Sequence, residues 1–202
     1  MTVRVVGESE RGSCVRSLRR LVLERVGNRR RERARGMDSV SEVSEKAVLL
    51  NYLAAQRRHI LSTIDGLTDD QLGLAPLPSG WTFTAMINHL ALDDEMFWFV
   101  CVLGADEEAI ASLDGDGWLL SDEDTPPVVL ARYREHVAKA DDVLGTVDLD
   151  APPAWWPTQL FGEWRLQSTR EVVLHVITEL SCHAGHLDVA RELVDGRQHL
   201  VL

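Results

Sequence analysis

Helical spacing of apolar residues is the feature that most constrains this chain. In four long segments, apolar residues recur at steps of three and four, which places them on one face of an α-helix. No segment shows the alternation of a half-buried strand. With 202 residues and 45% hydrophobic content, the chain has enough apolar surface for one core. We therefore expect an all-α protein with a four-helix bundle over residues 39–66, 82–103, 125–145 and 168–195.

Residues typical of helix ends bound these segments. Start signals are Ser39 with Glu42, Thr125 with Pro126, and Ser168 with Glu171. Glycines that favour helix termination are Gly66, Gly145 and Gly196. Between the second and third segments lies the acidic, glycine-rich stretch "GADEEAIASLDGDGWLLSDEDTPP". A connection of this length is compatible with a crossover between distant helix ends.

The first 36 residues differ in charge from the rest. They contain 11 Arg and 4 Glu, a net charge of +7, which leaves −18 for the remainder of a chain whose total is −11. We interpret residues 1–36 as a poorly ordered or partly helical extension that precedes a bundle over residues 37–202. A nucleic-acid arm and a targeting segment are the alternatives for the extension. The acidic body disfavours nucleic-acid binding through the bundle itself.

Composition also indicates the compartment. No apolar run approaches the ~20 residues of a membrane span, and the start lacks the pattern of a secretory signal. The three cysteines, Cys14, Cys101 and Cys182, form no close pair, so we expect reduced thiols. These observations predict a cytoplasmic protein with no membrane partner and no nucleic-acid partner.

One polar row interrupts the apolar pattern of the last segment, in and before the stretch "TELSCHAGHLD". His175, Glu179, His183 and His186 fall within a sector of ~80° on a helix, flanked by apolar residues. Burying imidazoles and a carboxylate without partners costs several kcal/mol. The row therefore requires hydrogen bonds, ion pairs or a cation.

A metal site is one solution for this row. Glu179 and His183, four residues apart, are close enough to bind one ion. The best third ligand is His89, which lies on or beside the inward stripe of residues 82–103, with Asp93 in reserve. Three nitrogen and oxygen ligands leave an open coordination position, as in catalytic sites. A water-filled polar core of hydrogen-bonded histidines is the alternative.

Two stretches, "PSGWTFTAMINHLALDDEMFWF" and "HVITELSCHAGHLDVARELVDG", resemble the DinB-like superfamily. They are most similar to its mycothiol S-transferase branch of actinobacteria, formerly a domain of unknown function, and the likeness covers about residues 40–197. The resemblance implies a four-helix bundle with a metal triad at His89, Glu179 and His183. His186 matches a position that supports the site or meets the cosubstrate. Cys182 stands where an arginine is expected, which leaves substrate contacts in doubt.

The resemblance also implies a reaction. A divalent ion, zinc first, with nickel, iron or manganese as alternatives, would deprotonate the thiol of the cosubstrate mycothiol. The thiolate would attack a small electrophile, in a role such as detoxification, with no protein catalytic group beyond the metal site. Indoles would shield the site mouth from water, and the candidates are Trp81, Trp98, Trp155, Trp156 and Trp164. Of these, Trp81 is predicted, together with His186, to contact the cosubstrate.

Two hypotheses of other classes compete with the enzyme. One is a non-enzymatic metal-binding stress protein, and the other is a helical module whose polar face mediates dimerisation. A homodimer is compatible with all three. The sequence leaves open the electrophile, the native metal and whether the thiol is mycothiol, since nitrogen and oxygen ligands discriminate poorly among these metals.

Overall fold

The computed structural model describes residues 43–113 and 115–199, and over these residues the regular elements are helical. The all-α class predicted from the sequence is confirmed. The predicted extension 1–36 and the start signals Ser39 and Glu42 lie outside the described residues. The long elements are α2 (Glu45–Ile64), α4 (Phe83–His89) continued by η1 (Leu90–Leu103), α6 (Pro126–Thr146) and α8 (Thr169–Asp195), and the short ones are α3 (Asp69–Leu72), α5 (Glu107–Ala111) and α7 (Thr158–Phe161).

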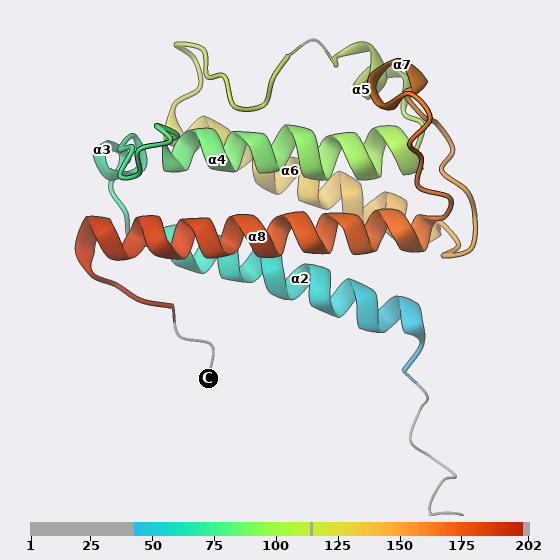
Figure 1. The fold of residues 1–202 in the computed structure, drawn as a ribbon, viewed down its shortest axis with the longest axis horizontal. Helices are drawn as coiled ribbons and strands as arrows, with labels where there is room; N and C mark the ends of the chain where they lie inside the picture. Colours follow the sequence, from blue (N-terminus) through green and yellow to red (C-terminus); the bar gives the residue numbers. More distant parts are fainter. Residues whose placement is uncertain (1–42, 114, 200–202) are drawn as a thin grey trace, which may run out of the picture. The chain divides into compact units, whose positions relative to one another are not determined.

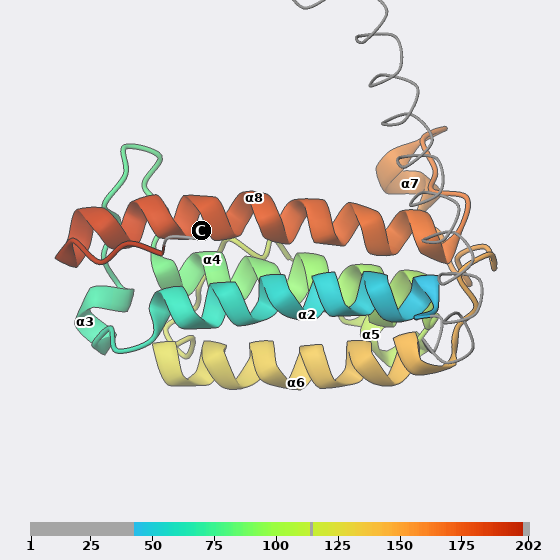
Figure 2. The ribbon, with the colours of Figure 1, turned by 90° about the horizontal axis from the view of Figure 1, so that it is seen from below.

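The long helical segments lie alongside one another (Figures 1 and 2), and their buried apolar side chains form a shared core. Helix α2 packs on α8, α4 and η1 pack on α6, and η1 also packs on α8. The bundle of DinB type stays a prediction at this level of detail. No described helix has the length and apolar composition for a membrane crossing. The largest apolar side chains that are at most 1% exposed are Leu53, Ile60, Phe83, Met86, Ile87, Leu90, Phe99, Tyr133, Leu144, Leu180 and Leu187.

Capping residues set the ends of the long helices. The hydroxyl of Ser168 accepts the N–H of Glu171 at 3.3 Å, and Gly196, at a φ of 76°, ends α8 as the sequence predicts. Helix α6 starts at Pro126 after the N-cap Thr125, also as predicted. Helix α2 begins at Glu45, with Ser44 as its N-cap, whereas the sequence predicts a helix from residue 39.

The sequence predicts one α-helix over residues 82–103, but the structure differs. The segment is α-helical up to His89, and from Leu90 to Leu103 it is a π-helix. In a π-helix each N–H bonds to the carbonyl five residues earlier. The side chain five positions on therefore lies near the face that it would leave in an α-helix. The N–H of Gly104 donates to the Phe99 carbonyl at 3.0 Å, which continues this pattern at the end of η1. Because apolar residues are frequent all around this segment, its hydrophobic pattern did not reveal the change of register.

A buried ion pair joins three of the long segments. Arg57 on α2 donates two hydrogen bonds to the carboxylate of Glu95 on η1, at 2.7 and 2.5 Å, and a third to Asp141 on α6 at 2.6 Å. The Glu95 side chain is 0% exposed and that of Arg57 is 7% exposed. The Arg57 guanidinium therefore ties η1 at Glu95 to both α2 and α6.

We predict that removing one member of the buried pair lowers the unfolding free energy far more than replacing both members with apolar residues. Arg57→Leu leaves the Glu95 charge without a partner in the core, which costs about 3–5 kcal/mol of unfolding free energy. The double variant Arg57→Leu with Glu95→Leu removes both charges and should recover most of that loss. Urea unfolding of the two single variants and the double variant measures the coupling. Additive losses in the double variant would contradict this account.

Candidate metal centre

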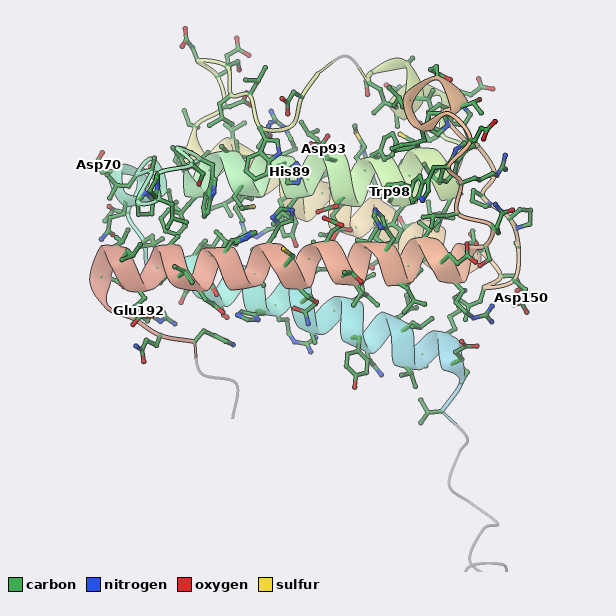
Figure 3. The ribbon with its side chains drawn as sticks, in the orientation of Figure 1. Asp70, His89, Asp93, Trp98, Asp150 and Glu192 are labelled. Atoms are coloured by element: carbon green, nitrogen blue, oxygen red, sulfur yellow. The ribbon has the colours of Figure 1, made fainter. Side chains whose placement is uncertain are left out.

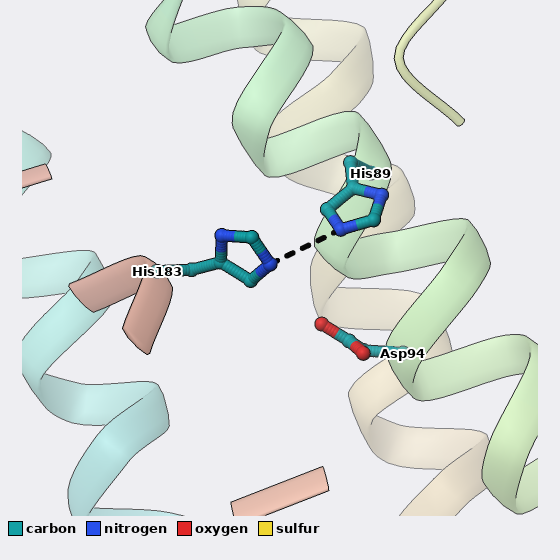
Figure 4. Close-up of side chains that lie close together, drawn as sticks. All are labelled: His89, Asp94 and His183. Carbon is teal, nitrogen blue, oxygen red and sulfur yellow. Dashed lines mark hydrogen bonds between the residues drawn. The ribbon is translucent and has the colours of Figure 1, made fainter. Parts of the chain in front are cut away.

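Two histidines from different helices face each other inside the described part of the chain. His89 ends α4 and His183 lies in the middle of α8, and their Nε2 atoms are 3.2 Å apart (Figure 4). The two rings meet edge to face, with centroids 4.9 Å apart. The structure thus brings together the two histidines that the sequence analysis selected as metal ligands.

Asp94 completes a close group with these histidines. One ligand atom from each of His89, Asp94 and His183 lies within 4.8 Å of the others (Figure 4). Asp94 is 3% exposed, and its Oδ2 has no hydrogen-bond partner among the described residues. Burial, together with the charges of Glu179, Glu95 and Asp93, raises the pKa of Asp94 well above its ordinary value. A cation beside this carboxylate would relieve both the missing partner and the repulsion.

Asp94 does not stand out in the sequence, because in an α-helix the residue one turn beyond His89 is Asp93, the reserve ligand. In the structure, Asp93 lies beside His89 and its Oδ2 is 2.7 Å from His89 Nδ1 (Figure 3). The π-helical register of η1 instead brings the fifth residue, Asp94, to the face of His89 that meets α8.

Asp93 fixes the orientation of His89. When His89 Nδ1–H donates to the Asp93 carboxylate, the lone pair of the neutral ring is on Nε2, the atom that faces His183. A carboxylate in this position is the usual partner of a metal-binding histidine, because it holds the ring and raises its basicity. Asp93 therefore supports the site from behind the ring.

The remaining members of the polar row lie farther from the centre. Glu179 Oε2 is 3.9 Å from His183 Nε2, and the Glu179 side chain is 41% exposed. His186 is exposed, with its ring centroid 5.8 Å from that of His183. His175 is half-buried against the edge of Trp98, at 4.6 Å between centroids. Of this row, His183 is the member that belongs to the close group with His89 and Asp94.

The donor atoms fit a divalent ion. Two nitrogens bound at 2.0–2.1 Å to a tetrahedral ion lie ~3.3 Å apart, close to the 3.2 Å between the two Nε2 atoms. Burial, and the neighbouring charges of His89 and His186, lower the pKa of His183 to about 4, so its ring is neutral at pH 7, the form that binds metals. The Oδ2 of Asp94 is buried without a partner in the described structure, and an ion would supply one. Imidazole and carboxylate together suit zinc and the late first-row metals.

An indole from the long connection covers the site. Trp118 stacks on the His89 ring, with centroids 4.2 Å apart and planes 17° apart, and its edge faces His183 at 6.0 Å. Hydrogen bonds hold this part of the connection on the bundle: the Asn88 amide donates to the Gly117 carbonyl at 2.8 Å, and Arg132 donates to Asn88 and to Asp124. The sequence did not predict Trp118 as a site residue, because a residue in a connection has no helical periodicity from which its position can be inferred.

Of the predicted indoles, Trp81 is the one found beside Trp118. The two indoles line a cleft of about 480 Å³, whose other lining residues are Ser79, Gly80, Thr82, Ala85, Leu119 and Leu120. Trp98, Trp156 and Trp164 pack instead around Phe161. Trp155 packs edge-on against Phe97. Trp81 therefore lies in a cleft with Trp118, and its predicted contact with the cosubstrate stays a prediction.

Comparison with known families gives one match, to a family model described as Mycothiol-S-transferase, over residues 48–196. The chain belongs to the mycothiol S-transferase family. The match runs from within α2 to the glycine that ends α8, and it includes every residue of the candidate centre. The predicted resemblance is thereby confirmed. No curated protein and no solved structure matches the chain.

We predict that Gly117 matters to this family member for the site more than for stability. A Cβ at Gly117 would overlap the Asp93 carboxylate, whereas a Cβ at Gly115 would meet no atom within 4 Å. Gly117→Ala should turn Asp93 away from His89 and weaken zinc binding by about 10–100-fold, with only a small change in melting temperature. Competition titration against a chromogenic chelator measures the affinity. Equal affinities of Gly117→Ala and the control Gly115→Ala would contradict this role.

The low pKa of His183 predicts how the stability of the metal-free protein depends on pH. Below pH 6.5 the unfolded chain protonates His183, but the folded chain does so only near pH 4, so the unfolded state binds more protons in this interval. The unfolding free energy should therefore fall as the pH drops from 6.5 to about 4, on the order of 2 kcal/mol through this residue. Denaturation in a chelator at several pH values tests this against His183→Asn. An equal slope in that variant would exclude His183 as the source.

Proposed function

We propose that the chain is a metal-dependent transferase that joins a low-molecular-weight thiol, mycothiol, to an electrophilic small molecule. Family membership supports the thiol and the reaction class. The observation that supports a metal site most directly is the pair of facing imidazole nitrogens of His89 and His183. They are 3.2 Å apart and lie beside the buried carboxylate of Asp94. Detoxification is the role that this chemistry fits best.

Both histidines and one of two carboxylates would hold the ion. His89, Glu179 and His183 are the ligands expected from the sequence, and His89, Asp94 and His183 are the closest group in the structure. The two sets share both histidines and differ only in the carboxylate. Three protein ligands leave an open position for the thiol sulfur, as in catalytic zinc sites. The carboxylate that is not a ligand then adds negative charge that favours a cation in this place.

A bound divalent ion lowers the pKa of a thiol that binds to it, so that the thiolate is present at neutral pH. The protein residues have other tasks. Asp93 holds His89 in its tautomer, and Trp118 covers the His89 ring from water. His186, exposed beside His183, is our candidate for contact with the cosubstrate.

The described cysteines do not provide an alternative nucleophile at the site. Burial, with the nearby charge of Asp106, raises the pKa of Cys101 to about 11, so this thiol stays protonated at pH 7. Cys182 is exposed and lies next to His183 in sequence, about 100° around the helix from it. The nucleophile in our proposal is therefore the thiol of the cosubstrate.

We predict a ranked loss of metal among site variants. His89→Ala and His183→Ala should retain little zinc per chain after identical loading, because each removes a shared ligand. Of Asp94→Asn and Glu179→Gln, the one that loses more identifies the carboxylate ligand, and the other should bind more weakly than wild type by about 10–100-fold. His186→Ala should keep a full equivalent. Full zinc in both histidine variants, or loss in His186→Ala alone, would refute the assignment.

The activity itself is tested by thiol consumption. Zinc-loaded protein with mycothiol and 1-chloro-2,4-dinitrobenzene should turn over, treatment with a chelator should abolish turnover, and added zinc should restore it. His183→Ala should lose activity at least about 100-fold. Bound metal without turnover for any thiol and electrophile would favour a metal-binding stress protein. A metal-free oligomer whose state depends on concentration would favour a dimerisation module.

A further inference from the structure

The cleft between Trp81 and Trp118 is connected to the candidate metal centre through a shared side chain. Trp118 lines the cleft and also stacks on the His89 ring, at 4.2 Å between centroids. A molecule in the cleft therefore lies one indole away from the histidine pair. With about 480 Å³, the cleft has the size of a small-molecule site.

The lining of the cleft favours uncharged ligands over charged ones. All eight of its lining residues are uncharged, and they include two indoles and two leucines. None of these residues offers a cation that could pair with an acidic group of a ligand. Nearby Arg132 is bonded to Asp124 and Asn88, so its guanidinium is already paired. Indole faces favour flat rings that stack on them.

We propose that this cleft binds the electrophile, and that the electrophile is an uncharged, planar aromatic molecule. The inference rests on the proposed function, because it assigns the second substrate of the same reaction. Trp81 and Trp118 supply stacking surfaces, and Leu119 and Leu120 supply apolar contact. An acidic electrophile would find no cationic partner among the residues that line the cleft.

The thiol cosubstrate belongs elsewhere on the site. Mycothiol carries many hydroxyl groups, which need hydrogen-bond partners. The cleft offers the side-chain hydroxyls of Ser79 and Thr82, and Thr82 already accepts the N–H of Ala85 at 3.0 Å as the cap of α4. The exposed face of α8 presents more polar groups, among them Glu179 and His186. The thiol would reach the metal centre from the exposed face of α8, and the electrophile would reach it from the cleft lined by Trp81 and Trp118.

The reaction with a model electrophile balances without another reagent. The sulfur of the mycothiol thiolate bonds to the ring carbon of 1-chloro-2,4-dinitrobenzene that carries chlorine. The carbon–chlorine bond breaks, and chloride leaves with its electron pair. The proton that the thiol loses goes to the solvent. The matched anionic electrophile is 4-chloro-3,5-dinitrobenzoate, which undergoes the same substitution but carries a carboxylate.

Kinetics with these two electrophiles test the proposal. After correction for the uncatalysed rates, kcat/KM should be at least about 10-fold higher for the uncharged one, which corresponds to 1.4 kcal/mol. Trp81→Leu should lower kcat/KM for it by about 10-fold, while zinc per chain and the KM for mycothiol stay unchanged. Trp164→Leu, which alters an indole packed on Phe161 instead, is the control. A preference for the anionic electrophile, or a raised KM for mycothiol in Trp81→Leu, would overturn the assignment.

A binding measurement separates this inference from the proposed function. The unreactive analogue 1,3-dinitrobenzene is titrated into the full zinc-loaded chain without thiol, and the indole N–H signals are followed by NMR. The signals of Trp81 and Trp118 should shift and that of Trp164 should not. Such shifts in a protein without turnover would refute the transferase and retain the aromatic site. Turnover without shifts of Trp81 and Trp118 would refute the site and retain the transferase.

Discussion

The approach of His89 to His183 is the contact on which the rest of this account depends. The two residues are 94 positions apart in the sequence and lie on different helices, yet their Nε2 atoms are separated by 3.2 Å. Such a distance requires α4 and η1 to pack closely on α8 and to keep one rotation about their own axis. The apolar core supplies the packing, and the buried pair of Arg57 and Glu95 restricts the rotation.

Much of the fold follows from local patterns in the sequence. Spacing of apolar residues and the signals at Thr125, Ser168 and Gly196 predicted the helices and several of their ends. The histidine pair was also accessible, because His183 belongs to a polar row on an apolar helix and His89 belongs to an inward stripe. Asp94 was not accessible, since its place depends on a π-helical register that hydrophobic periodicity does not encode.

Trp118 illustrates a second limit of sequence reasoning. Its stacking on His89 depends on the path of a long connection, and that path is set by side chains distant in sequence, Asn88 and Arg132. The connection divides the surroundings of the histidines into two chemical regions. On one side are carboxylates that favour a cation, and on the other is an uncharged cleft lined by indoles. The proposed reaction uses both, a cation that binds the thiol sulfur and an uncharged cleft that binds a neutral electrophile.

X-ray absorption at the zinc edge of the loaded protein tests the central claim most directly. Our account predicts two imidazole nitrogens at about 2.0–2.1 Å and at least one carboxylate oxygen, with a sulfur appearing near 2.3 Å when mycothiol is added. Among the described residues, neither Cys101 nor Cys182 belongs to the close group around His89 and His183, so a sulfur that appears only after mycothiol is added comes from the cosubstrate. A spectrum without imidazole scattering, or one that mycothiol leaves unchanged, would contradict the proposed centre.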